Sequence, residues 1–183
     1  MGLRWAALLR GINVGGHNRL PMADLRVALT AAGLTDVRTY IQSGNVVFDA
    51  EPEGAWDETS LASLISTAIT ASSGLNVPVV IRPVDQLARI AGEHPDAGGP
   101  VPEKWLHVFL LDGPAAGGSV PEAERYHPDR IVLGEREVYV TYADGSGRSK
   151  LTIDVVERAF GVTATARNVT TIGRLVALAA DER

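Results

Sequence analysis

The sequence predicts an α+β protein that starts with a ferredoxin-like βαββαβ unit and continues with a second, degenerate βαββαβ-like unit and a C-terminal helix. Three observations lead to this prediction. Short apolar or alternating segments, bounded by turn residues, predict strands. Longer segments with apolar residues at helical spacing predict helices between them. Over residues 1–83 the order is strand, helix, strand, strand, helix, strand, which is the ferredoxin-like motif.

The first half of this unit is predicted as a strand, a helix and a hairpin. Leu3–Leu9 is an apolar run between arginines, which is typical of a central strand. Pro21 suits the start of a helix, because the N–H that proline lacks has no partner there, and Gly33 suits its end. Alternating residues around a glycine turn predict the two strands of the hairpin, Val37–Gln42 and Asn45–Asp49.

The second half is predicted as a capped helix and an edge strand. Asp57 can cap the helix, whose apolar face ends at Gly74. Val77–Arg82 follows as the fourth strand. Pro78 lacks the N–H that an interior strand needs, so it agrees with the edge position that the ferredoxin-like order gives this strand.

The rest of the chain is predicted as a connection and a second α+β subdomain. Residues 84–104 read as a short helix and a Gly- and Pro-rich linker, and residues 105–183 as the second subdomain with its closing helix. Its strands are predicted over Trp105–Leu111, Arg130–Leu133, Glu137–Tyr142 and Val162–Ala166. Its helices are predicted over Glu122–Tyr126, Leu151–Phe160 and Thr171–Ala180.

The composition narrows the class of function. A chain of 183 residues can bury a core without metal or disulfide, and the absence of cysteine excludes disulfides, thiolate catalysis and cysteine-bound metals. The net charge of −5 argues against a general nucleic-acid binder. The uncharged run Thr59–Ile81 is rich in hydroxyl residues, so it predicts a helix and a strand of a soluble protein rather than a membrane span. We therefore expect a cytoplasmic protein with no membrane partner, no metal and no cofactor.

The loop between the first strand and the first helix is one candidate binding site. Its backbone N–H groups can converge on an anion at the helix N-terminus. It matches neither the Walker A motif nor the dinucleotide-binding fingerprint, and a structural loop with glycines at positive φ is the alternative. The candidate ligand-binding residues of this loop are Arg10, Asn13, Gly15, Gly16 and Asn18.

Two further candidate segments place cations before helix starts. A cation there opposes the helix dipole unless it shares an anion with the backbone N–H groups. This applies to Lys150 and to Arg167, and Asn168 adds a polar amide. The alternatives are a solvated lysine, an Arg167 paired with a carboxylate, and an Asn168 that caps the last helix. The basic residues that share this position are Arg19, Arg148, Lys150 and Arg167, and we hypothesise that several of them surround one phosphate or carboxylate.

The predicted hairpin turn is the last candidate site. Ser43 and Asn45 present polar side chains there, although ordinary turn chemistry explains the same residues. Catalytic chemistry has less support. The four histidines lack metal-ligand spacing, and neither a GxSxG elbow nor an SxxK pair is present. No catalytic residue is predicted, so the sequence leaves open whether the protein is an enzyme.

Several motifs of the chain are distinctive: Leu8–Gly16, Met22–Arg26, Val37–Phe48, Ser149–Leu151 and Thr165–Asn168. They closely resemble the bacterial domain-of-unknown-function 1697 family. The resemblance spans nearly the whole chain and implies a ferredoxin-like N-terminal subdomain, with no activity to carry over. Two positions depart from the family pattern: His17 stands where lysine is frequent, and Val169 where tryptophan is common.

Three functional hypotheses follow. In the first, the three loops form a polar surface that binds a small anionic ligand bearing phosphate or carboxylate, held by the cations and oriented by the amides. In the second, the protein is a nucleic-acid or nucleotide-binding module that uses the sheet face, with Trp5 and Phe48 as stacking residues. In the third, it is a scaffold or interaction protein. The sequence leaves the ligand and the oligomeric state open.

Overall fold

The structure is a computed structural model that describes residues 4–50, 56–115, 120 and 123–181. The chain divides into two compact units. The first unit comprises Met1–Leu87 with Arg174–Arg183, and the second comprises Ala88–Gly173. The last residues of the chain therefore belong with the N-terminal unit.

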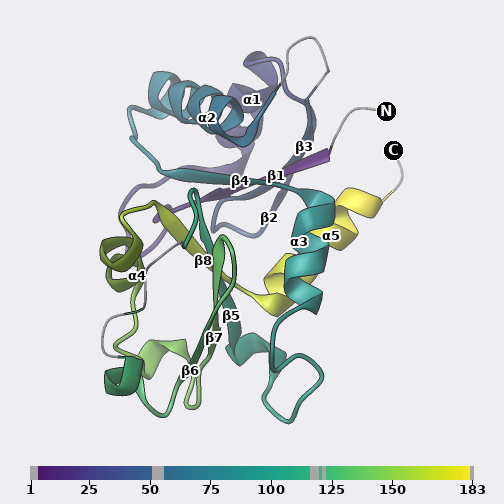
Figure 1. Cartoon of the computed structure of the whole chain (residues 1–183). Helices are drawn as coiled ribbons and strands as arrows, with labels where there is room; N and C mark the ends of the chain where they lie inside the picture. The colour runs from purple at the N-terminus through teal and green to yellow at the C-terminus, as the bar shows by residue number, and fades with distance from the viewer. Residues whose placement is uncertain (1–3, 51–55, 116–119, 121–122, 182–183) are drawn as a thin grey trace. The chain divides into compact units, whose positions relative to one another are not determined.

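A four-stranded antiparallel sheet forms the centre of the first unit (Figure 1). Its strands are β1 (Arg4–Leu9), β2 (Thr35–Tyr40), β3 (Asn45–Asp49) and β4 (Val79–Pro83), in the order β2-β3-β1-β4. The predicted order and the edge position of the fourth strand are both confirmed. Pro78 directly precedes β4 and uses its carbonyl to accept the Arg10 N–H at 2.9 Å.

Two helices cover one face of this sheet, α1 (Met22–Ala31) and α2 (Glu58–Ser73) (Figure 1). Asp57 caps α2 as predicted: its carboxylate accepts the Ser60 N–H at 2.7 Å, and the Ser60 hydroxyl accepts the Asp57 N–H at 3.0 Å. Gly74 ends α2 in the left-handed conformation. The large side chains buried between sheet and helices each contribute about 1.5–3 kcal/mol. They include Leu9, Leu25, Phe48, Leu61, Ile65 and Ile81.

The hairpin turn of the first unit depends on a glycine. Gly44 has φ +73°, and a Cβ at this position would lie 2.6 Å from Leu9 Cβ and 2.8 Å from Ile12 Cδ1. The close approach exists because the Leu9 N–H donates to the Gly44 carbonyl at 2.8 Å. Ile41 in the same turn also has positive φ, 49°, which is unusual for a β-branched residue.

A network of ion pairs fastens the end of the chain to the first sheet. Arg4 pairs with Asp49 at 2.8 Å and also contacts Asp36, which Arg38 holds at 2.9 Å. Both arginines donate to carbonyls at the end of the last helix, α5 (Val169–Ala180). The hydrogen bond to Asp49 raises the pKa of Arg4, although burial acts in the opposite direction. These guanidinium groups satisfy carbonyls that a helix end leaves without partners.

The second unit repeats the sheet order of the first. Its strands are β5 (Leu106–Leu111), β6 (Arg130–Leu133), β7 (Glu137–Thr141) and β8 (Ala164–Asn168), in the order β6-β7-β5-β8. The predicted second βαββαβ-like unit is therefore confirmed. It is degenerate, because the described residues between β5 and β6 contain a 3-10 turn where the first unit has α1. The remaining elements are α3 (Val84–Gly92), η1 (Glu103–Trp105), η2 (Ala123–Tyr126), η3 (Ser146–Arg148) and α4 (Ile153–Phe160).

The predicted bounds of the last strand and the predicted start of the last helix are wrong. The strand expected over Val162–Ala166 lies at Ala164–Asn168, and α5 follows at once from Val169. The segment around Arg167 is therefore a strand rather than a loop, because it pairs with β5 in the register Val108↔Arg167 and His107↔Asn168. That partner strand is distant in sequence, so local patterning does not reveal the pairing.

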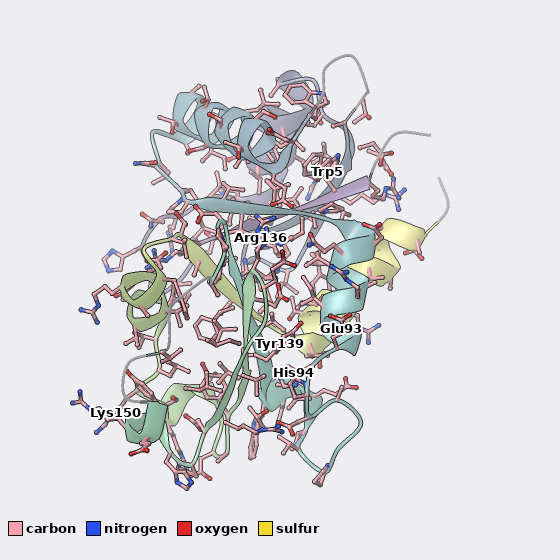
Figure 2. The ribbon with its side chains drawn as sticks, in the orientation of Figure 1. Trp5, Glu93, His94, Arg136, Tyr139 and Lys150 are labelled. Atoms are coloured by element: carbon pink, nitrogen blue, oxygen red, sulfur yellow. The ribbon has the colours of Figure 1, made fainter. Side chains whose placement is uncertain are left out.

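Two histidines are packed against tyrosines in the second unit. The ring centroids of His94 and Tyr139 lie 5.5 Å apart and those of His107 and Tyr142 lie 4.9 Å apart, both in an edge-to-face arrangement. Figure 2 shows His94 and Tyr139 near each other. Burial lowers the pKa of both histidines, in His94 against the favourable charge of Asp96. The imidazole rings are thus favoured in their neutral forms in the folded protein.

The Gly44→Ala variant is expected to lose about 2–4 kcal/mol of unfolding free energy, because a methyl group adds a clash to an unfavourable φ. Gly74→Ala is the matched control, since Gly74 has φ +72° with nothing within 4 Å. It should lose only about 1–2 kcal/mol. Urea unfolding of both variants measures the difference, and equal losses would contradict the close approach at Gly44.

The free energy of unfolding is expected to fall as the pH drops below about 6.5. The unfolded chain then binds protons at His94 and His107, while the folded state, with lowered pKa values, stays neutral until lower pH. Each histidine contributes a slope on the order of 1 kcal/mol per pH unit in this window. Urea unfolding across the window measures it. His94→Phe should flatten the slope relative to His17→Gln, and an unchanged slope in His94→Phe would contradict the account.

Candidate functional site

A pocket of about 190 Å³ opens in the second unit, between two of its loops. One wall is the segment from η2 to the start of β6, and the other is the connection from β7 to α4, which contains η3. We call it the loop pocket. Its lining residues are Arg125, Tyr126, His127, Pro128, Asp129, Asp144, Gly145, Arg148, Ser149 and Lys150.

One hydrogen bond joins the two walls of the loop pocket, and a second one stabilises the wall between η2 and β6. The Asp129 carboxylate accepts the Ala143 N–H at 3.0 Å, and the Asp129 N–H donates to the Tyr126 carbonyl at 2.9 Å. Tyr126 also packs against the core of the unit. The carboxylate of Asp129 thus holds the pocket together, which uses part of its capacity to accept hydrogen bonds.

The β7–α4 wall is a tight turn over an aromatic ring. Gly145 has φ +83°, and a Cβ there would lie 3.4 Å from Nε1 of Trp105. The turn η3 follows, with the Arg148 N–H donating to the Gly145 carbonyl at 3.2 Å. The Ser149 hydroxyl then accepts the Leu151 N–H at 3.0 Å. These contacts set the backbone from which Arg148 and Lys150 project.

Two cations of the loop pocket have no ion-pair partner among the described residues. Arg148 and Lys150 are exposed, and neither forms an ion pair within 4.0 Å in the part of the chain that the structure describes. Figure 2 labels Lys150 at the surface of this unit, away from its sheet. With Arg125 the pocket holds three cationic side chains beside two carboxylates, Asp129 and Asp144. Two cations without partners on one small concave surface can hold an anion.

The predicted site residues of the first loop mostly hold the loop itself. The Asn13 amide group donates to the carbonyls of Leu20 and Gln42 at 2.9 and 2.7 Å, and its oxygen accepts the Leu20 N–H at 2.9 Å. Asn18 donates to the Gly11 carbonyl at 3.0 Å. The side chains of both asparagines therefore act on the backbone of the loop and of the neighbouring hairpin turn.

The glycines of this loop form its tip. Gly15 and Gly16 have φ values of 58° and 81°, which is the geometry of a type I′ turn. The bond from the His17 N–H to the Val14 carbonyl at 3.0 Å closes it. Arg10 is half-buried, and its N–H donates to the Pro78 carbonyl. This loop thus has the features of the structural alternative, in which glycines supply positive φ.

Ser43 and Asn45 also have structural contacts. Asn45 is fully buried and donates to the Tyr40 carbonyl at 3.2 Å and to the Ser43 hydroxyl at 2.8 Å. These bonds brace the turn in which Gly44 lies. Ordinary turn chemistry accounts for both residues.

In the second unit, the structure separates Lys150 from the other two predicted residues. Lys150 lines the loop pocket, whereas Arg167 and Asn168 do not. Arg167 donates to the Thr165 hydroxyl at 2.9 Å and to the Ala166 carbonyl at 2.8 Å, and burial lowers its pKa to about 10. Asn168 accepts the Thr171 N–H at 2.7 Å as a cap of α5. That residues of the three loops share one ligand stays a prediction.

The sequence reasoning missed most of the loop pocket. It identified Lys150 and Arg148 by their place before a helix, but not the opposite wall from Arg125 to Asp129. The only signal there is a run of polar and charged residues between a short helix and a strand, which also describes an ordinary loop. The segment is recognised as a pocket wall only from the structure, in which the Asp129 carboxylate accepts the Ala143 N–H.

The nucleic-acid hypothesis expects Trp5 and Phe48 to be exposed for stacking on bases, and this expectation is wrong. Trp5 is 7% exposed and Phe48 is fully buried, and both lie in the core of the first unit. Their period-two positions on β1 and β3 place them on the face that α1 and α2 cover, so they cannot stack on bases.

Two further observations concern the described part of the chain. No group of three histidine or carboxylate side chains there is placed to hold a metal ion. None of the helices in it combines the length and the apolar character that crossing a bilayer demands.

Comparison with known proteins supports the fold. A search of curated proteins finds no match. A solved structure of the conserved bacterial protein SP0830 from Streptococcus pneumoniae is 20% identical, with a TM-score of 0.60 over 98% of this chain and 99% of that chain. The model of the family described as "Protein of unknown function (DUF1697)" matches residues 3–139, which include one wall of the loop pocket. The chain therefore belongs to the DUF1697 family, as its motifs predict.

Proposed function

We propose that this protein binds a small ligand that carries a phosphate or carboxylate group, and that the loop pocket is its site. The observation that carries the proposal is that Arg148 and Lys150 line one pocket without a carboxylate partner in the described chain. Arg125 adds a third cation to the same surface.

The types of cation suit an oxyanion. An arginine guanidinium can bind two oxygens of a phosphate or carboxylate at once, and a lysine ammonium adds a mobile point charge. The turn of η3 and the bond from Ala143 to Asp129 hold the backbone in place on both walls. Binding therefore requires ordering of side chains rather than of loops, which limits its entropic cost.

The size of the loop pocket limits the ligand. At about 190 Å³ it is smaller than the roughly 300–1,000 Å³ of sites that enclose a drug-sized molecule. An anionic group with a few attached atoms fits this space, either as a small metabolite or as the end of a larger one.

Phosphate or sulfate is expected to bind the wild-type protein, and Arg148→Gln or Lys150→Gln should each weaken binding about tenfold, because each removes a charge-assisted hydrogen bond. Isothermal titration calorimetry at low salt measures the affinity. Stability should change by less than about 0.5 kcal/mol, since both side chains are exposed.

The chain offers matched controls for both substitutions. Lys104 is the only other lysine, and Arg158 is an exposed arginine of α4; both belong to the second unit and lie outside the loop pocket. Lys104→Gln and Arg158→Gln should leave the affinity unchanged. Absence of binding to the wild type, or equal effects of the pocket and control variants, would refute the proposal.

A further inference from the structure

The carboxylate of Asp144 lines the loop pocket, where its negative charge is unfavourable for binding an anion. Asp144 lines the same pocket as Arg148 and Lys150, is exposed, and pairs with neither of them within 4.0 Å. Unlike Asp129, which accepts the Ala143 N–H, Asp144 has no side-chain hydrogen bond in the described chain. Its capacity to accept hydrogen bonds is thus directed at the pocket or at solvent.

Resting on the proposed function, we infer that the ligand of the loop pocket is a phosphate ester that also carries a hydrogen-bond donor, which Asp144 accepts. Asp144 weakens the binding of an anion that lacks such a donor, because like charges share the small volume. An ammonium or hydroxyl group on the ligand converts the same carboxylate into an attractive partner.

The charges of the residues that line the pocket support this inference. The cations Arg148 and Lys150 and the carboxylate Asp144 all come from one short segment, yet they stay apart instead of neutralising one another. A pocket whose lining carries unpaired cations together with an unpaired carboxylate matches a molecule with an anionic group and a donor group. The volume of about 190 Å³ leaves room for a phosphate with a short chain attached.

Three phosphate esters that share a two-carbon chain test the inference. Ethyl phosphate, 2-hydroxyethyl phosphate and 2-aminoethyl phosphate differ only in carrying no donor, a hydroxyl or an ammonium group on the same carbon. Calorimetric titration at about pH 8 keeps the phosphate mostly dianionic, since its second pKa is about 6. The wild type should bind 2-aminoethyl phosphate at least about tenfold more tightly than ethyl phosphate, with 2-hydroxyethyl phosphate between them.

The Asp144→Asn variant tests whether the preference for a ligand with a donor group depends on the Asp144 carboxylate. The variant should bind ethyl phosphate as tightly as the wild type or more tightly, because a like charge is removed, and it should lose most of the preference for 2-aminoethyl phosphate. Asp154→Asn is the control: Asp154 is exposed on α4 and outside the loop pocket, and its removal should leave the preference intact.

The outcomes distinguish the two proposals. Binding of all three esters with equal affinity, or a preference that survives in Asp144→Asn, overturns the inference and leaves the anion site in place. No binding of any ester to the wild type overturns the anion site as well. Loss of all binding in Asp144→Asn, with a native unfolding transition, also contradicts the inference, because ethyl phosphate does not need Asp144.

Discussion

Each unit depends on burying two adjacent antiparallel strands at the centre of its sheet, β1 with β3 and β5 with β7. Nearly every residue of these strands is buried, so their backbone groups must be paired within the sheet, and most of their side chains are apolar. Exposed polar side chains are therefore found mainly in the connections at the sheet ends. The same strand order in both units, with β1 corresponding to β5 and β4 to β8, gives the two units equivalent sets of connections.

Local physics made most of the fold predictable. The bounds of β3 and β6 match the expectation, and the Asp57 cap and the Gly74 terminus follow from side-chain and backbone chemistry within one helix. The prediction failed where a distant partner decides the structure. Arg167 and Asn168 belong to β8 because β5 pairs with them, and nothing in the adjacent sequence encodes that pairing.

The candidate site was harder to predict because the same polar residue types can bind a ligand or stabilise the backbone of a turn. Asn13 and Asn45 have amides that could hold an anion, but these groups bond to backbone carbonyls that the turns leave without partners. Lys150 lies before a helix and does line the loop pocket, whereas Arg167 in a comparable position is half-buried in a strand. The wall from Arg125 to Asp129 becomes visible only through the bond between Asp129 and Ala143.

Arg148 and Lys150 have no ion-pair partner among the described residues and line a pocket whose two walls a hydrogen bond joins. A crystal structure of the full chain soaked in sulfate tests this most directly. The account predicts a tetrahedral anion in the loop pocket, within hydrogen-bond distance of both side chains. A pocket without the anion, with Arg148 and Lys150 each paired to a carboxylate of the protein, would contradict it.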